Sequence, residues 1–264
     1  MGTVESLPLI TSSILSKKIA SGLSSLVLDV KVGNGSFNST IDIARDLSNS
    51  LVRVAKGAGL HCEAILTDMN QVLGKSAGHT LEILECIKYI KNDFKDHRLE
   101  KITNELISSL LVNIYKISKE EAYNKINTVI NNGLAAEKFE MMVAALGGPK
   151  NILSSYEKDL INTSVRKDVF SSEQGWIEKI HTRELGLILI ELGGGRKQVT
   201  DKINYGVGYD NVLNIGDEVN SSTPLLSLYS SKNIDDNLIN KIKDCFIISN
   251  KKTQKLSEIF ETIN

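Results

Sequence analysis

The sequence has few aromatic residues, few prolines and almost no net charge. Aromatic side chains make up 5% of the 264 positions, with one tryptophan, and there are three prolines. The 31 basic and 32 acidic residues leave a formal net charge of −1. This balance gives no electrostatic case for binding a nucleic acid or an anionic membrane surface. A content of 41% hydrophobic and 24% charged residues is typical of one large globular unit or two smaller ones.

Cysteine and histidine are also scarce, and their spacing does not match CxxC motifs or common metal-binding motifs. Cys62, Cys86 and Cys245 form no CxxC pair and are odd in number. Each lies in an apolar context, so we expect three buried thiols in a reducing compartment. The four histidines show no metal-ligand spacing.

Long hydrophobic runs are absent as well. No apolar stretch approaches the roughly 20 residues that span a bilayer. The opening MGTVESLPLI lacks the basic region and the long apolar core of a secretory signal. These absences predict a soluble cytoplasmic protein with no membrane partner.

The first seventy residues predict a helix, a strand, a second helix and a second strand. The four segments are 8–20, Ser25–Lys31, Ser39–Lys56 and Cys62–Thr67. We expect Ser39 to cap the second helix. Its apolar stripe is predicted to consist of Ile43, Leu47, Leu51 and Val54. A strand–helix–strand order at this spacing predicts a parallel pair with a right-handed crossover.

In the remaining sequence, the predicted secondary structure changes from helices to short strands at about residue 165. Helices are predicted at Thr80–Lys91, His97–Ile117, from a capping box at Ser118–Glu121 to Gly133, and at Ala135–Leu146. Short apolar runs separated by glycine and polar turns then predict antiparallel strands. These runs are Gly175–His181, Leu187–Leu192, Tyr205–Tyr209 and Leu225–Tyr229.

Two loops follow the predicted parallel strands, and ligands of open α/β sheets bind at such strand ends. The loops are 32–37 and 67–70, which we expect at one edge of the sheet. The Gly-Asn-Gly of the first loop either cradles phosphate through backbone amides or forms a tight turn that needs positive φ. Side chains alternate along a strand, so Asp29 and Lys31, which are two residues apart, lie on the same side. An ion pair between them could order the loop.

Ser13 and Lys17 are four residues apart, so on a helix they share one face. One offers a hydroxyl and the other a mobile cation. From the residues alone, a solvated helix face is the more common interpretation of such a pair.

Two stretches carry a family resemblance: LPLITSSILSKKIASGLSSLVLDVKVGNG at 7–35 and LTDMNQVLGKSAGHTLEILE at 66–85. They resemble the pyrimidine-nucleoside phosphorylases, a family that includes the thymidine phosphorylases. The sequence from GWIEKIHTRELG onward resembles the C-terminal domain of the same enzymes. Because the match starts in mid-pattern at Met1, the resemblance implies the C-terminal part of such an enzyme.

The resemblance implies an α/β fold with a mixed or parallel sheet and flanking helices, incomplete in this chain, followed by a β-rich α+β domain. It divides the chain into a helix of an α-helical lobe at 1–20, a partial central α/β domain at 21–164, and a C-terminal β-rich domain at 165–264.

The resemblance also implies a site for a pyrimidine base. Ser13 and Lys17 match the serine and first lysine that contact the base in the family, and Ile10 and Phe37 match apolar positions near it. The family's third base-binding residue, an arginine, would precede Met1. Its phosphate-binding lysine-histidine-serine-threonine stretch has no counterpart in residues 1–264.

A monovalent cation, usually potassium, is implied at a second place. Leu73 and Ser76 match positions that give backbone carbonyls to the ion, and Glu85 matches one that gives a carboxylate. The alternative is that Glu85 is a carboxylate on a helix surface.

The implied reaction is phosphorolysis of thymidine or deoxyuridine to the free base and 2-deoxyribose 1-phosphate, which makes the family one of pentosyltransferases. Inorganic phosphate is the co-substrate, no organic cofactor is expected, and the family is homodimeric. We expect this chain to be inactive alone. The alternatives are a phosphoribosyltransferase-type enzyme, a family without the β-rich tail, and a non-catalytic remnant or binding fragment.

Overall fold

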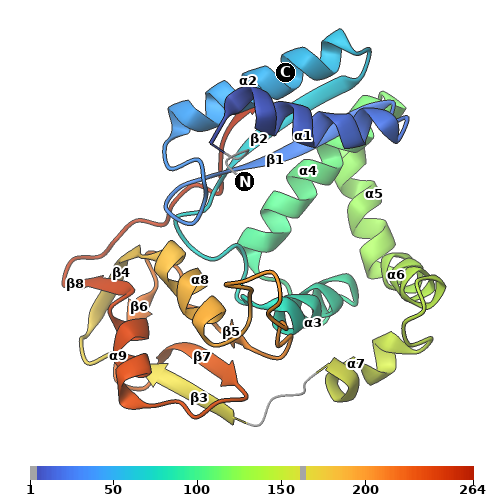
Figure 1. The fold of residues 1–264 in the computed structure, drawn as a ribbon. Coiled ribbons are helices and arrows are strands. Elements are labelled where there is room, and N and C mark those ends of the chain that lie inside the picture. Colours follow the sequence, from blue (N-terminus) through green and yellow to red (C-terminus); the bar gives the residue numbers. More distant parts are fainter. Residues whose placement is uncertain (1–4, 161–164) are drawn as a thin grey trace. The chain divides into compact units, whose positions relative to one another are not determined.

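The computed structural model describes residues 5–160 and 165–264 (Figure 1). The chain forms two compact units that interleave along the sequence. The first unit contains the residues up to Asn70, Lys101–Asn127 and Ser257–Asn264, and the second contains Gln71–Glu100 and Thr128–Leu256. The α/β class predicted from the sequence is confirmed by helices that accompany small mixed and antiparallel sheets.

A three-stranded mixed sheet forms the centre of the first unit. Its order is β1-β2-β9, with β1 at Ser25–Val32, β2 at His61–Asp68 and β9 at Ile259–Ile263. β1 and β2 run parallel, from Ser25 opposite His61 to Val32 opposite Asp68, which confirms the predicted pair. β9 pairs antiparallel with β2 and was not predicted.

Two helices accompany this sheet: α1 at Leu7–Ala20 and α2 at Ile41–Gly57. The cap of α2 is Thr40, whose side chain accepts the amide of Ile43, so the prediction of Ser39 is wrong by one residue. The predicted stripe is also partly wrong, because Ile43 and Val54 are 47% and 43% exposed. The helix instead buries Ala44, Ser48, Leu51, Val52 and Ala55. Small side chains on this face let the helix approach closely, and hydrophobicity alone did not single them out.

The core of the first unit lies between these helices and the strands. It contains Leu15 of α1, Val30 of β1, Leu51 of α2 and Cys62 of β2, each at most 5% exposed. Burial raises the pKa of the Cys62 thiol to about 11. Burial is thus confirmed for Cys62 and for Cys245, but Cys86 is exposed, and its prediction is wrong.

The helical middle of the chain agrees with the sequence pattern. Four helices correspond to predicted ones: α3 at His79–Ile90, α4 at His97–Tyr115, α5 at Lys119–Asn131 and α6 at Leu134–Ala145. The helix α7 at Ile152–Leu160 was not predicted. The predicted capping box is present, because Ser118 donates its amide to Glu121 at 2.9 Å and Glu121 donates its amide to the Ser118 hydroxyl at 3.1 Å. Gly133, with φ of +80°, separates α5 from α6.

Two small antiparallel sheets form the β-rich part of the second unit. One has the order β3-β7-β5 and the other β6-β4-β8. The strands are β3 at Val165–Phe170, β4 at Gly175–Ile180, β5 at Gly208–Asp210, β6 at Glu218–Val219, β7 at Pro224–Ser230 and β8 at Phe246–Ser249. The antiparallel pairing after residue 165 is therefore confirmed.

Two predicted strands of this part are wrong or misplaced. The run Leu187–Leu192 lies in and just after helix α8 at Thr182–Glu191, and a continuous apolar run does not distinguish a buried helix from a strand. Of the run Tyr205–Tyr209, only its end enters β5. The helix α9 at Asp236–Lys243, capped by Asp235, was not predicted.

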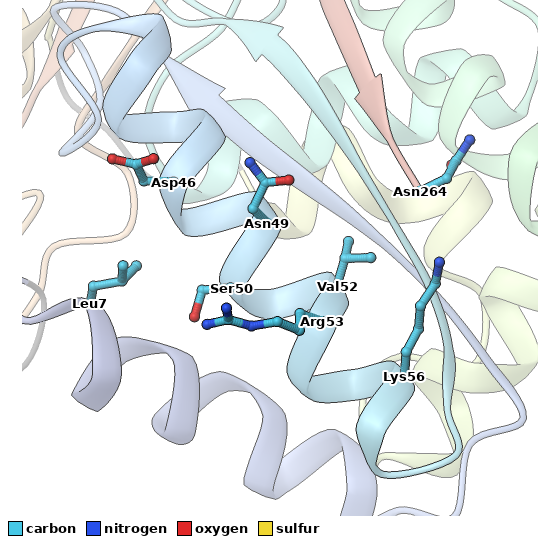
Figure 2. A pocket seen from close by; sticks show the side chains of 8 residues that line it. All are labelled: Leu7, Asp46, Asn49, Ser50, Val52, Arg53, Lys56 and Asn264. Carbon is cyan, nitrogen blue, oxygen red and sulfur yellow. The ribbon is translucent and has the colours of Figure 1, made fainter.

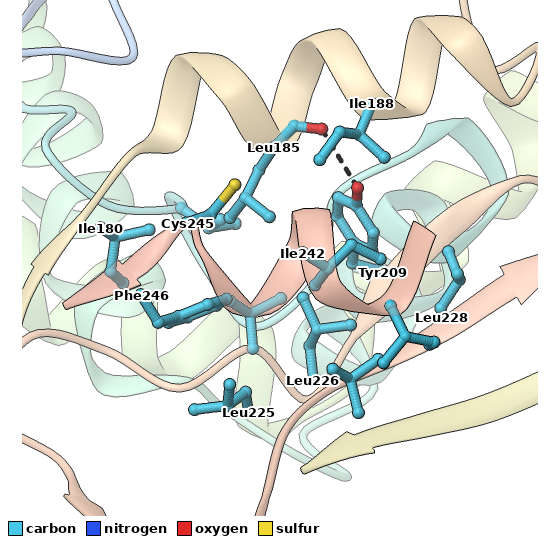
Figure 3. Packing of buried hydrophobic residues seen from close by; sticks show 14 of the residues in the cluster. Ile180, Leu185, Ile188, Tyr209, Leu225, Leu226, Leu228, Ile242, Cys245 and Phe246 are labelled. Atoms are coloured by element: carbon cyan, nitrogen blue, oxygen red, sulfur yellow. Dashed lines mark hydrogen bonds between the residues drawn. The ribbon is translucent and has the colours of Figure 1, made fainter. Parts of the chain in front are cut away.

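The core of the second unit is packed around one tyrosine (Figure 3). Tyr209 of β5 is fully buried, and its hydroxyl donates a hydrogen bond of 3.2 Å to the carbonyl oxygen of Leu185 in α8. Burial raises the pKa of this phenol well above its ordinary value. Ile180, Leu226 and Ile242 pack in the same cluster, so the two sheets and the neighbouring helices share one apolar interior.

The predicted domain limits, 1–20, 21–164 and 165–264, do not fall on the borders between the two compact units. They describe a division along the sequence and stay a prediction. Among the described helices, none is both long enough and apolar enough to cross a membrane.

Candidate functional site

The loops after the two parallel strands lie together, as the sequence predicts. Met69 donates its amide to the carbonyl oxygen of Val32 at 2.6 Å, and Gly35 donates to the carbonyl of Met69 at 2.9 Å. The amide of Asn34 donates to the side-chain oxygen of Asn70 at 3.1 Å. The carboxyl ends of β1 and β2 therefore form one continuous edge, where ligands of α/β sheets bind.

The Gly-Asn-Gly loop uses its amides for its own turn. Gly33 donates to the carbonyl of Asn38, and Ser36 donates to the carbonyl of Gly33, each at 3.0 Å. Gly33 has φ of +130°, and a Cβ there would lie 2.6 Å from the Asn70 side-chain oxygen. This geometry favours the tight-turn interpretation over a phosphate cradle, because the amide hydrogens already point at protein oxygens.

Asp29 and Lys31 form the predicted ion pair, and a third residue completes it. The Lys31 ammonium lies 2.6 Å from the Asp29 carboxylate and donates to the Thr67 hydroxyl at 3.0 Å. Thr67, which is fully buried, donates that hydroxyl to Asp29 at 2.5 Å. The carbonyl oxygen of Lys31 also accepts the Ser36 hydroxyl and the Asn38 side-chain amide. We call Asp29, Lys31 and Thr67 the strand-end triad. It joins the two strands, and the carbonyl of Lys31 holds the loop that follows β1.

The predicted base-binding residues lie on α1 and in this loop. Ser13 and Lys17 are both exposed on α1, one turn apart. Ile10 is half-buried, and Phe37 is 75% exposed. In the part of the chain that the structure describes, no hydrogen bond or ion pair engages the side chains of Ser13 and Lys17. The structure thus leaves both polar groups accessible, and the base-binding roles of all four residues stay predictions.

Helix α1 is apolar around most of its circumference. Leu15 and Thr11 are buried, whereas Leu7, Leu9 and Ile19 are 40%, 52% and 42% exposed. A helix with apolar side chains on all sides is usually covered on all sides. The accessible Ser13 and Lys17 therefore stand among exposed apolar side chains.

A cavity of about 570 Å³ opens between α1 and α2 (Figure 2). Its lining consists of Leu7, Asp46, Asn49, Ser50, Val52, Arg53, Lys56 and Asn264. The Thr11 and Ser50 hydroxyls, 3.0 Å apart, join the two helices beside it. None of the four predicted base-binding residues is among the lining residues of this cavity.

The second predicted site lies in the other compact unit, around the carboxylate of Glu85. Glu85 is 7% exposed, so the alternative of a helix-surface carboxylate is wrong. Its two oxygens accept the amides of Lys75 at 2.8 Å and Ser76 at 3.0 Å. Burial raises the pKa of Glu85, and these two amide bonds act against the rise.

The surroundings of Glu85 fit a bound cation. Within residues 5–160 and 165–264, no lysine or arginine forms an ion pair with this carboxylate, and buried charges are usually paired or coordinate a metal. A Cβ at Gly74 would lie 2.5 Å from a Glu85 oxygen, so the backbone of the loop packs directly on the carboxylate. Leu73 is half-buried just before this contact. The structure brings the backbone amide of Ser76 to the Glu85 carboxylate. Carboxylate oxygens, and the carbonyl oxygens that the resemblance implies as further ligands, are hard donors suited to such an ion.

Sequence reasoning missed Asp210, which lies beside this loop. The Ser76 hydroxyl donates a hydrogen bond of 3.1 Å to the Asp210 carboxylate. Ser76, Glu85 and Asp210 all line a cavity of about 500 Å³. The two partners are 134 residues apart in sequence, so no local pattern could have joined them.

Two known families match parts of this chain. The family described as "Glycosyl transferase family, a/b domain" matches residues 1–136, and "Pyrimidine nucleoside phosphorylase C-terminal domain" matches residues 176–249. The first match covers the parallel strands and the loops at their ends, and the second covers most of the β-rich part. By family, these two matches place the chain among the pentosyltransferases.

A curated relative narrows this class further. The chain is 45% identical over 229 residues to the thymidine phosphorylase of Colwellia psychrerythraea strain 34H. The protein belongs to the thymidine and pyrimidine-nucleoside phosphorylase family. The aligned part is 86% of this chain and 52% of that relative, so the chain spans about half the length of the curated relative it matches.

Proposed function

We propose that this chain forms part of an enzyme that phosphorolyses thymidine or deoxyuridine. The free base and 2-deoxyribose 1-phosphate are the products, and inorganic phosphate is the co-substrate. The observation that carries the proposal is the match of residues 1–136 to the α/β domain of the family, with Ser13 and Lys17 inside it. The match of the β-rich part to the pyrimidine-nucleoside phosphorylases supports it over a phosphoribosyltransferase.

Ser13 and Lys17 are proposed to bind the pyrimidine base. A uracil-type ring presents two carbonyl oxygens and an N–H, and a serine hydroxyl can donate to or accept from these groups. The base leaves as an anion, and a nearby ammonium stabilises the charge that develops on it. Both side chains are accessible on one face of α1, as this role requires. Ile10 and Phe37 are proposed to contact the apolar parts of the base.

We propose that Leu73, Ser76 and Glu85 bind a potassium ion. We propose no organic cofactor for the reaction. When bound, the ion would offset the buried negative charge of Glu85. A homodimer in the cytoplasm is part of the same proposal. Residues 1–264 contain no lysine-histidine-serine-threonine stretch, and we propose that these residues alone do not complete the reaction.

The test is phosphate-dependent release of thymine from thymidine by the complete protein that carries these residues. Lys17→Ala should lower kcat/KM by about a hundredfold, the cost of removing one group that stabilises developing charge. Lys18→Ala is the matched control, since Lys18 is its exposed neighbour on the same helix, and it should change the rate little. Equal effects of the two substitutions would contradict the base-binding role of Lys17. Absence of thymine release by the unsubstituted protein would contradict the proposed function itself.

A further inference from the structure

The loop that carries the predicted cation site is bonded to strand β5 of the C-terminal β-rich part. Ala77 donates its amide to the carbonyl of Tyr209 at 3.0 Å, and Tyr209 donates back to Ala77 at 2.7 Å. Val212 donates its amide to the carbonyl of Lys75 at 3.0 Å. The backbone of the loop therefore pairs with β5 and the residues that follow it, although more than a hundred residues separate the two segments in sequence.

Two glycines bring these backbones into direct contact. A Cβ at Gly78 would lie 2.5 Å from the carbonyl oxygen of Val207, and one at Gly208 would lie 2.6 Å from that of Ala77. Gly78 also has φ of +117°, which side-chain-bearing residues rarely adopt. No side chain fits between the loop and the strand, so the position of one fixes the position of the other.

Ser76 lies at the centre of this contact, between two carboxylates. Its amide donates to Glu85 of α3 at 3.0 Å, and its hydroxyl donates to Asp210 of β5 at 3.1 Å. The same Asp210 oxygen accepts the amide of Asn211 at 2.8 Å, which orients the carboxylate. Asp210 thus reaches the predicted site through Ser76.

We propose that Asp210 is a positioning residue for the monovalent cation, acting through Ser76. This inference rests on the proposed function, which places Leu73, Ser76 and Glu85 around the ion. The Asp210 carboxylate holds the Ser76 side chain, and thereby keeps the backbone of residues 73–76 against Glu85. Partners of this kind, which orient the ligands of an ion without touching it, contribute strongly to affinity.

The experiment measures the thermal unfolding midpoint of the 264-residue chain during a KCl titration. N-methylglucamine chloride keeps the ionic strength constant. The unsubstituted chain should be stabilised by K⁺. Asp210→Ala should raise the K⁺ concentration for half-maximal stabilisation by about tenfold or more. Asp210→Asn should stay within about threefold, because its amide oxygen still accepts the Ser76 hydroxyl.

Two further variants make the outcome decisive. Ser76→Ala removes the donated hydroxyl but keeps the backbone carbonyl, so it should match Asp210→Ala, and the double variant should be no weaker than either. Asp236→Asn is the charge control, because its side chain is 98% exposed, and it should leave the K⁺ response unchanged.

Three results would overturn the proposal. They are an unchanged K⁺ response in Asp210→Ala, a loss in Asp210→Asn as large as in Asp210→Ala, and additive losses in the double variant. Absence of any K⁺ response in the unsubstituted chain would also overturn it, whereas phosphorolysis by the complete protein would then leave the proposed function standing.

Discussion

The ammonium of Lys31 lies 2.6 Å from the carboxylate of Asp29, two residues earlier on the same strand. The buried Thr67 hydroxyl on the neighbouring strand bonds both groups. The triad joins β1 to β2 at the edge where the two loops meet, and the carbonyl of Lys31 anchors Ser36 and Asn38. The geometry of this edge therefore depends on residues that need not contact any ligand.

Replacement of Asp29 by alanine should weaken the first unit. It leaves the Lys31 ammonium and the Thr67 hydroxyl without their shared acceptor. Because both charged side chains keep about a quarter of their surface exposed, we expect a loss of about 1–2 kcal/mol in the free energy of unfolding, less than for a fully buried pair. Urea denaturation measures the loss.

Asp42→Ala serves as the control for this substitution. Asp42 pairs with Arg45 on the exposed surface of α2, and such pairs contribute about 0.5 kcal/mol or less. A loss in Asp29→Ala no larger than in Asp42→Ala would show that the strand-end triad does not stabilise this edge.

Gly33→Ala should disrupt the loop that carries Phe37. The new Cβ would lie 2.6 Å from the Asn70 side-chain oxygen, at a residue with φ of +130°. We expect a loss of about 1–3 kcal/mol, the usual cost of a strained backbone position. Denaturant unfolding measures it, with faster cleavage of the loop by a protease as a second observable.

Gly57→Ala is the matched control in the same unit. Gly57 is the last residue of α2, and a Cβ there meets nothing within 4 Å. The substitution should be neutral or should stabilise the protein by about 0.5 kcal/mol, because alanine restricts the unfolded chain. If Gly33→Ala were equally harmless, the turn would not require its observed conformation.

Local sequence patterns predicted the first half of the fold well. The helix at 8–20, the parallel strands and the capping box at Ser118 depend on neighbours close in sequence, and each is present. The run Leu187–Leu192 was wrong because its burial in α8 depends on the distant strands that it packs against. β9 was missed for a similar reason, since its alternating, half-exposed residues form a strand only beside β2.

In the candidate site, too, local spacing predicts some contacts and misses others. The shared face of Ser13 and Lys17 follows from helical spacing alone, and the pairing of Asp29 with Lys31 follows from strand alternation. The hydrogen bonds of Ser76 to Asp210 and of Thr67 to Asp29 join residues 134 and 38 positions apart. Such contacts depend on tertiary packing, which a single sequence does not reveal.

The thiols should react in two classes. Cys86 is exposed, whereas Cys62 and Cys245 are buried. The pKa of all three thiols is raised, to about 11 for Cys62 and Cys245, so the difference in reactivity depends on accessibility. Since the thiolate is the nucleophile, the buried thiols should stay unmodified in the native protein. At pH 8, Ellman's reagent should titrate one thiol in the folded chain and three after unfolding in guanidinium chloride. Cys86→Ser should abolish the native reaction, and modification of a second thiol in the native Cys86→Ser protein would contradict the burial of Cys62 and Cys245.

The pH dependence of stability should reveal the buried carboxylate of Glu85. Its native pKa is raised by burial above the ordinary value of 4.5, with a smaller contribution from nearby Asp96. In the window between these two pKa values, the native state holds a proton that the unfolded state has released. The contribution of Glu85 to the free energy of unfolding is therefore greatest below pH 4.5 and falls as the pH rises through the native pKa.

Comparison with Glu85→Gln isolates this contribution from those of the other acidic groups. The glutamine side chain keeps one oxygen acceptor for the loop amides and does not titrate. The difference in unfolding free energy, unsubstituted minus Glu85→Gln, should therefore decrease from pH 4 to pH 7 in K⁺-free buffer. Addition of KCl should oppose the decrease at the upper end of this range, because an ion bound beside the carboxylate favours its charged form. A difference that is constant with pH would show that Glu85 titrates alike in the native and unfolded states, and would contradict the raised native pKa.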